Sequence, residues 1–176
     1  MKVLQAMEYY FDYHRMNSKK NTVTSYKPIL SKFRVQYGDK DIETISSAEI
    51  LSFLTSITKS TKQTTKRLQY IILHSFFNFI INTFNDKIQN PCNSILLRKT
   101  FKNAKQTQWK ILEKETVDEI IFKASSPRNR LLIELMARGG MRIGEVLEIK
   151  PSDVEDRKII LHNPKSSRDA EIVFIP

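Results

Sequence analysis

Residues 60–84, "STKQTTKRLQYIILHSFFNFIINTF", constrain the fold more than any other part of the chain. Apolar side chains recur there with the i, i+3, i+4, i+7 spacing of one helical face. The predicted inward face is formed by Leu68, Ile71, Ile72, Ser75, Phe76, Phe79 and Ile80. Because a helix with an apolar face is stabilised mainly by packing that face, the stretch predicts a helical bundle. The chain has only four glycines and six prolines in 176 residues, which disfavours a turn-rich all-β fold.

Three further helices are predicted before this one. The first contains an apolar stripe with Tyr10 beside it, and the second begins near Thr22 and ends at Gly38. The third begins with a capping box in which Ser46 and Glu49 exchange hydrogen bonds. The stripes of the three helices consist, in order, of Val3, Leu4, Met7, Phe11 and His14; of Tyr26, Ile29, Leu30, Phe33 and Tyr37; and of Ile50, Leu51, Leu54 and Ile57. Residues 1–92 therefore predict a four-helix bundle that Asn90-Pro91 closes.

Residues 93–110 are basic and poor in apolar periodicity, so we expect an extended or loosely helical linker. A second domain is predicted over residues 111–176. Its helices contain Val117 and Ile121, then Leu131, Leu132 and Leu135, then the short stretch "RIGEVLEI". The segments "KIILH" and "AEIVFI" are predicted strands joined by "NPKSSRD" as a hairpin. The expected fold is mainly α, a bundle followed by an α+β unit.

The net positive charge of the chain lies in its first part. Residues 1–107 hold 17 Lys and Arg against 7 Asp and Glu, whereas residues 108–176 hold 12 of each, so the first part carries the whole net charge of +10. A one-sided basic charge attracts polyanions, and nucleic acid is the usual partner. A surface that is basic only for solubility is the alternative. The cations are interspersed with threonines and asparagines and do not form one basic amphipathic helix, which counts against a membrane surface.

Several other classes of protein are disfavoured. The single cysteine, Cys92, cannot form an internal disulfide, which fits a reducing compartment. The N-terminus has no apolar core of a signal peptide, and no apolar run approaches a membrane span. The three histidines are too far apart to suggest a metal site, and no Gly-rich phosphate loop is present. We expect a cytoplasmic protein without cofactor or metal.

The stretch "ARGGMRIGEVL" places Arg142 directly after the helix-ending pair Gly139-Gly140. An arginine at this point can offer its planar fork to a phosphate, and Glu145 can hold its rotamer. The alternative is an exposed i, i+3 ion pair worth about 0.3–0.5 kcal/mol.

The order of these features resembles the tyrosine recombinases, the phage integrase family of site-specific DNA recombinases. Gly140, Arg142 and Glu145 match the family's T-G-x-R-x-x-E pattern, with Gly139 in place of threonine and Leu147 following two residues after the glutamate. Residues 151–154, "PSDV", look like its W-x-D-I turn. Residues 1–92 are similar to its SAM-like core-binding domain, including the closing Asn-Pro, and residues 111–176 to the first part of its catalytic domain. The resemblance covers nearly the whole chain.

The resemblance implies a clamp around duplex DNA in which a tyrosine attacks a phosphate without any metal. Carried over, Arg142 matches the first catalytic arginine, Glu145 its acidic companion, and Lys165 the hairpin lysine that protonates the leaving oxygen. For Lys165 the alternative is a solvated turn lysine. The family's second arginine and its tyrosine do not occur within these 176 residues, so we expect this chain to bind DNA but not to cleave it. Full-length relatives are expected to form oligomers on DNA, and this chain to be a monomer.

Candidate DNA contacts follow from polar and cationic side chains at two helix starts and in the linker. They are Asn21, Thr22 and Lys27; Thr61, Lys62, Gln63, Thr65, Lys66 and Arg67; and Lys99, Lys102 and Lys105. For each of them, an ordinary solvated helix start is the alternative. A different function also remains open at this point: an integrase-like regulatory or protein-interaction module without catalysis.

Overall fold

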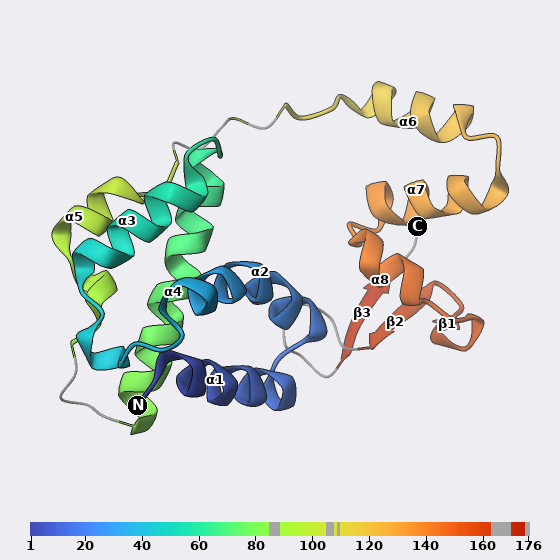
Figure 1. The fold of residues 1–176 in the computed structure, drawn as a ribbon. Helices are drawn as coiled ribbons and strands as arrows, with labels where there is room; N and C mark the ends of the chain where they lie inside the picture. The colour runs from blue at the N-terminus through green and yellow to red at the C-terminus, as the bar shows by residue number, and fades with distance from the viewer. Residues whose placement is uncertain (85–88, 105–107, 109, 163–169, 175–176) are drawn as a thin grey trace. The chain divides into compact units, whose positions relative to one another are not determined.

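The computed structural model describes residues 1–84, 89–104, 108, 110–162 and 170–174 (Figure 1). The chain divides into two compact units, Met1–Thr107 and Gln108–Pro176. The first is helical, and the second combines three helices with a small antiparallel sheet. The predicted fold class, mainly α with a bundle followed by a hairpin-containing unit, is confirmed. None of the described helices is long and apolar enough to cross a bilayer.

The first unit is built around the long helix α4. Its main helices are α1 (Val3–Asn17), α2 (Lys20–Tyr37), α3 (Ser47–Thr58) and α4 (Gln63–Phe84), with a short 3-10 helix η1 (Ile42–Thr44) before α3. In the core, the Phe33 ring meets Phe53 and Phe77 edge to face at centroid distances of 5.1 and 6.1 Å. These edge-to-face contacts between fully buried rings stabilise the bundle beyond the area that they bury.

The inward face of α4 differs from the one predicted. Leu68 and Ile71 are 52% and 44% exposed, whereas Tyr70 is only 3% exposed. The helix is covered by α1, α2 and α3 and also by the 3-10 helix η2 (Pro91–Asn93). Because η2 covers a side of α4 that a four-helix arrangement would leave to solvent, the buried face extends to Tyr70 and away from Leu68.

Part of the predicted linker belongs to the first unit. Residues Ile95–Thr100 form a short helix, α5, which follows η2. Leu97 is fully buried and Phe101 is 1% exposed, and both lie in the core of the first unit. Residues 95–101, within the stretch predicted as an extended or loosely helical linker, therefore pack on the first unit. Two apolar anchors four residues apart suffice to dock a single turn, but they are too few to give a periodic pattern.

The predicted capping box of α3 is present and includes a third partner. Ser46 Oγ accepts from the Glu49 amide, and Glu49 Oε2 accepts from the Ser46 amide at 3.0 Å. Lys40 Nζ lies 2.5 Å from Glu49 Oε1. The Lys40 ammonium, followed by the Ser46 amide, lowers the pKa of Glu49 to about 2. The carboxylate is therefore more stable in the folded protein than in the unfolded chain.

Glu49→Gln should lower the free energy of unfolding of the first unit by about 1 kcal/mol at pH 7, a typical capping contribution. Because the folded pKa lies below the ordinary value, the native contribution is present above pH 4.5 and is lost as the pH falls toward 2. The variant should therefore lose less stability than the native chain between pH 6 and pH 3. Urea unfolding at both pH values measures this. Glu43→Gln, at an exposed position of η1, is the matched control; an equal effect there would contradict the assignment to the capping box.

In the second unit, α7 and α8 pack with the sheet around one small core. Its elements are α6 (Lys114–Lys123), α7 (Pro127–Arg138), α8 (Ile143–Glu148), the 3-10 helix η3 (Pro151–Asp153), and the strands β1 (Val154–Glu155), β2 (Lys158–His162) and β3 (Ala170–Phe174). The sheet order is β1-β2-β3, antiparallel throughout, with Ile160 opposite Ile172. Leu135, Met141 and Val146 join β2 residues in the core. This core places the start of α8 beside the sheet.

Candidate phosphate-binding and nucleic-acid interface

The glycine pair before Arg142 reverses the chain between α7 and α8. Gly139 caps α7, and Gly140 adopts φ +65°, a left-handed conformation that favours glycine. The next residue, Met141, is 4% exposed and its amide donates to the Leu135 carbonyl. Because Met141 is anchored in the core, Arg142 follows at a fixed point, immediately before α8.

Arg142 and Glu145 form a small, well-defined pair, as the i, i+3 spacing predicted. The Arg142 amide donates to Glu145 Oε2 at 2.8 Å, and Arg142 Nη1 donates to Glu145 Oε1 at 3.0 Å. The Glu145 side chain is 14% exposed, whereas that of Arg142 is 64% exposed. The carboxylate thus holds both the backbone and the guanidinium of one arginine, and most of that guanidinium faces solvent. A guanidinium has five N–H groups, so it can bind a phosphate while keeping the contact with Glu145.

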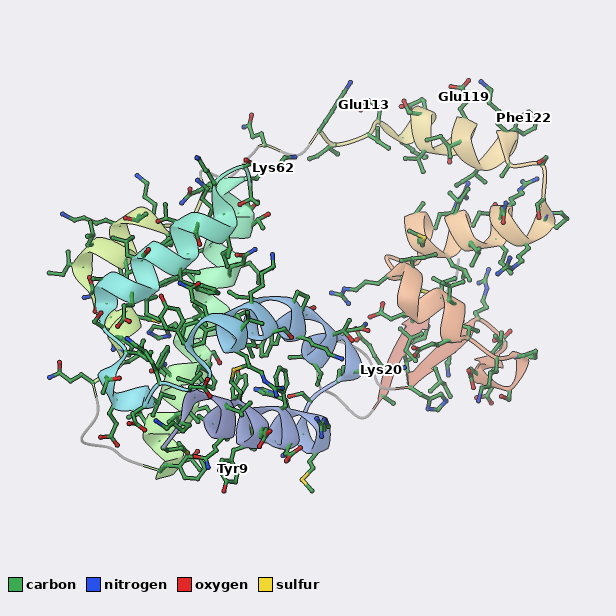
Figure 2. All side chains as sticks on the ribbon, viewed as in Figure 1. Tyr9, Lys20, Lys62, Glu113, Glu119 and Phe122 are labelled. Atoms are coloured by element: carbon green, nitrogen blue, oxygen red, sulfur yellow. The ribbon has the colours of Figure 1, made fainter. Side chains whose placement is uncertain are left out.

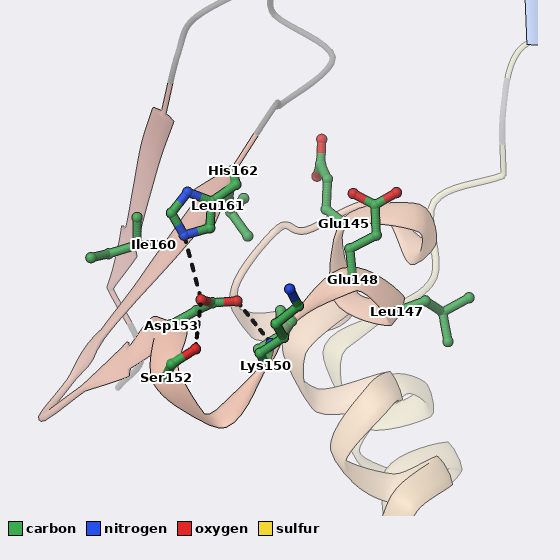
Figure 3. Close-up of a pocket in the computed structure, with 10 residues that line it drawn as sticks. Glu145, Leu147, Glu148, Lys150, Ser152, Asp153, Ile160, Leu161 and His162 are labelled. Atoms are coloured by element: carbon green, nitrogen blue, oxygen red, sulfur yellow. Dashed lines mark hydrogen bonds and ion pairs between the residues drawn. The ribbon is translucent and has the colours of Figure 1, made fainter. Parts of the chain in front are cut away.

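A pocket of about 720 Å³ lies beside this pair, between α8 and the sheet (Figure 3). Asp153 lines this pocket and contacts two other lining residues. Its Oδ2 accepts from the Lys150 amide at 2.8 Å, and its Oδ1 lies 3.4 Å from His162 Nε2. The bond from the Lys150 amide, chiefly, lowers the pKa of Asp153. Asp153 therefore connects η3 with His162, the last residue of β2. Figure 3 shows Glu145 and Glu148 projecting from α8 at the same pocket.

The hairpin lysine predicted to act with Arg142 cannot be placed. Lys165 lies outside the described residues, as does Lys105. The described strands β2 and β3 are antiparallel, and their register pairs His162 with Ala170. Within the described part of the chain, no cluster of three or more His, Cys, Asp or Glu residues could hold a metal ion.

The candidate cations of the first unit are mostly accessible. Lys27, Lys62, Lys99 and Lys102 are exposed, Lys66 is half-buried, and none of these five forms an ion pair with a described residue. Asn21 is exposed, whereas Thr22, Thr61 and Thr65 are half-buried, and the Thr61 hydroxyl donates to the Thr58 carbonyl. Figure 2 labels Lys62 before α4 and Lys20 at the start of α2. Lys20 is a further exposed cation that was not selected from the sequence, although the run "SKKN" indicates it.

Lys27 lies on α2, whereas Lys62 and Lys66 lie at the start of α4. Lys27 lines a pocket of about 220 Å³ between α1 and α2, together with Arg15 and Arg34. Apolar side chains, including those of Leu4 and Phe11, line the same pocket. The accessible cations of the first unit therefore lie in more than one group.

Gln63 and Arg67 both make hydrogen bonds to backbone carbonyls of the first unit. Gln63 Nε2 donates to the carbonyls of Thr100 and Lys102, and Arg67 Nη1 donates to the carbonyl of Phe101. Three further polar side chains on α4 also bind residues that follow this helix in the sequence. Tyr70 bonds the Cys92 carbonyl, His74 the Asn93 side chain, and Asn78 accepts from Asn90. Gln63, Arg67, Tyr70, His74 and Asn78 thus form a polar stripe on α4 that holds residues 90–102.

Comparison with curated proteins finds tyrosine recombinases. The chain is 24% identical over 181 residues to tyrosine recombinase XerC of Lacticaseibacillus casei, covering 99% of this chain and 60% of that protein. It is 27% identical over 160 residues to tyrosine recombinase XerD of Oceanobacillus iheyensis, covering 85% of this chain and 52% of that protein. The chain thus spans between half and three-fifths of the length of these relatives. No protein-family model matches the sequence.

Solved structures with the same fold are integrases. A lambda integrase dimer bound to a COC′ core site superposes with a TM-score of 0.72 at 19% identity, covering 99% of this chain and 49% of that one. The Tn1549 transposon integrase in complex with transposon right end DNA gives a TM-score of 0.73 at 16% identity, covering all of this chain and 61% of that one. The chain therefore resembles the tyrosine recombinases in sequence along nearly its whole length, and its fold is that of the matching part of the integrases.

Proposed function

We propose that this chain binds duplex DNA, as part of a protein that breaks and rejoins DNA in the manner of a tyrosine recombinase. The observation that carries the proposal is the confinement of the whole net charge of +10 to residues 1–107, which form one compact unit with accessible lysines. Cations gathered on one unit bind phosphates by releasing the counterions of DNA. The recombinase names of the relatives and the DNA in the integrase structures support the same partner.

Arg142 is proposed to bind a phosphate of that DNA. Glu145 fixes the backbone and one edge of the guanidinium, which leaves the arginine pre-oriented at little further cost in side-chain entropy. Lys165 is proposed as its partner and general acid, with Glu145 as the positioning carboxylate. The remaining DNA contacts are proposed to come from Asn21, Thr22, Lys27, Thr61, Lys62, Thr65, Lys66, Lys99, Lys102 and Lys105.

Binding without cleavage is proposed for this chain. All six tyrosines lie between residues 9 and 70, in the first unit, whereas Arg142 lies in the second. Tyr10, Tyr37 and Tyr70 are buried in the bundle core. The unit that holds the phosphate-binding arginine therefore offers no tyrosine to attack it. We propose that the chain is a monomer in the absence of DNA and associates with the nucleoid in the cytoplasm.

A titration of labelled duplex with the chain at several salt concentrations tests the proposal. Binding is expected at low salt, with log affinity falling linearly with log salt by about 0.9 for each phosphate neutralised. A duplex carrying a nick near the binding site should give no adduct that survives denaturation. Absence of binding at low salt, or binding without salt dependence, would contradict the proposal. If this chain shows no DNA affinity but captures a full-length recombinase, the result would instead support a regulatory module. The exposed side chains of Phe122 and Leu131 favour that alternative.

A further inference from the structure

We propose that Gln63 and Arg67 are positioning residues, which join the start of α4 and the end of α5 into one phosphate-binding surface. The inference rests on the proposed DNA binding and changes the role of two residues within it. In this surface, the lysines at the start of α4, Lys62 and Lys66, act together with those at the end of α5, Lys99 and Lys102.

Gln63 makes the first link between the two elements. Its Nε2 donates to the Thr100 carbonyl at 3.1 Å and to the Lys102 carbonyl at 3.0 Å. The last carbonyls of a helix have no partner within the helix, so the end of α5 needs donors from elsewhere. One neutral side chain therefore supplies these donors and holds the end of α5 against the first turn of α4.

Arg67, one turn further along α4, makes the second link. Its Nη1 donates to the Phe101 carbonyl at 3.2 Å, and its guanidinium lies 5.2 Å from the centroid of the Tyr70 ring. The Tyr70 ring in turn stacks on Phe101, with centroids 5.7 Å apart and planes 10° apart. Arg67 Nε is buried and makes no hydrogen bond within the described part of the chain. Arg67 is thus half-buried, holds the backbone at Phe101, and adds its charge to the local field.

These links determine where four lysines lie. Lys62 immediately precedes α4 and Lys66 lies in its first turn, whereas Lys99 precedes Thr100 and the carbonyl of Lys102 is itself bound by Gln63. The backbones of the two groups are therefore within reach of one glutamine side chain. The four positive charges of these lysines repel one another. Hydrogen bonds from Gln63 and Arg67 offset this repulsion in the free protein, and the phosphodiester backbone of a duplex is a ligand that relieves it.

Gln63→Met tests the assembly, since it keeps the side-chain length and the net charge but removes both donors. We expect the end of α5 to separate from α4, so that Lys99 and Lys102 no longer bind the same stretch of DNA. The slope of log affinity against log salt should fall by about 1.8, the equivalent of two phosphates, and affinity at low salt should fall about tenfold. Amide hydrogen exchange over residues 98–102 should accelerate without DNA. Gln36→Met, at an exposed position of α2, is the matched control and should change none of these three quantities.

A second comparison separates this inference from general DNA binding. Lys99→Ala with Lys102→Ala should lower the salt slope of the native chain but have little further effect in the Gln63→Met background. Full additivity of the two changes, or an unchanged slope in Gln63→Met, would overturn the inference. If the native chain shows no DNA affinity, the proposed function fails, and hydrogen exchange still decides the assembly. Faster exchange over residues 98–102 in Gln63→Met would then support the two links, and unchanged exchange would overturn them.

Discussion

Replacing Lys62 and Lys66 together by glutamate should weaken binding to duplex DNA by about 100-fold at low salt. The double substitution changes the net charge of the first unit by −4 out of +10, and it introduces repulsion at the start of α4 in place of two phosphate contacts. Each lost contact should also lower the salt slope by about 0.9. A binding titration at two or more salt concentrations measures both effects.

The matched control for this pair is Lys114→Glu with Lys158→Glu in the second unit. Both lysines are exposed, and the change in net charge is identical. Residues 108–176 carry no net charge, so the control is expected to weaken binding by less than about fivefold through the general field. Equal losses in the two variants would show that only total charge matters, and they would contradict a DNA-binding surface at the start of α4.

Phe33→Ala should destabilise the first unit by about 3–5 kcal/mol, the usual range for a phenylalanine removed from a packed core. Phe33 is fully buried and contacts the rings of Phe53 and Phe77, so the cavity would be lined by aromatic groups that cannot collapse into it. A loss of this size is a large fraction of the stability of an ordinary domain. All six tyrosines lie in the first unit, so near-ultraviolet circular dichroism from tyrosine follows its unfolding by urea selectively.

Phe84→Ala provides the matched control for the core substitution. Phe84 is 46% exposed at the end of α4 and contacts only the Tyr9 ring among the described aromatic pairs, at a centroid distance of 5.0 Å. Its removal should cost less than about 1.5 kcal/mol. A comparable loss in the two variants would mean that the bundle does not depend on the edge-to-face cluster around Phe33.

Local features of this chain were well predicted because their causes are local. The Ser46–Glu49 box and the Arg142–Glu145 pair both join residues three positions apart, and helical geometry brings such residues together in any fold. The core positions of α2 followed from one apolar stripe, since only one of its faces packs on the bundle. The buried face of α4 was predicted less well, because the stripe with Leu68 and Ile71 does not reveal which neighbours surround the helix.

The sequence by itself determined the helical bundle, the confinement of positive charge to the first unit, and the pairing of Arg142 with Glu145, because periodicity, composition and short spacings are properties of the chain. Only the tertiary structure decided what the polar stripe on α4 does. Gln63 and Arg67 bind carbonyls that lie 34 to 39 residues further along the chain. No local pattern shows that a glutamine and an arginine will meet the end of a six-residue helix, since contacts between side chains and distant backbone depend on how the bundle closes.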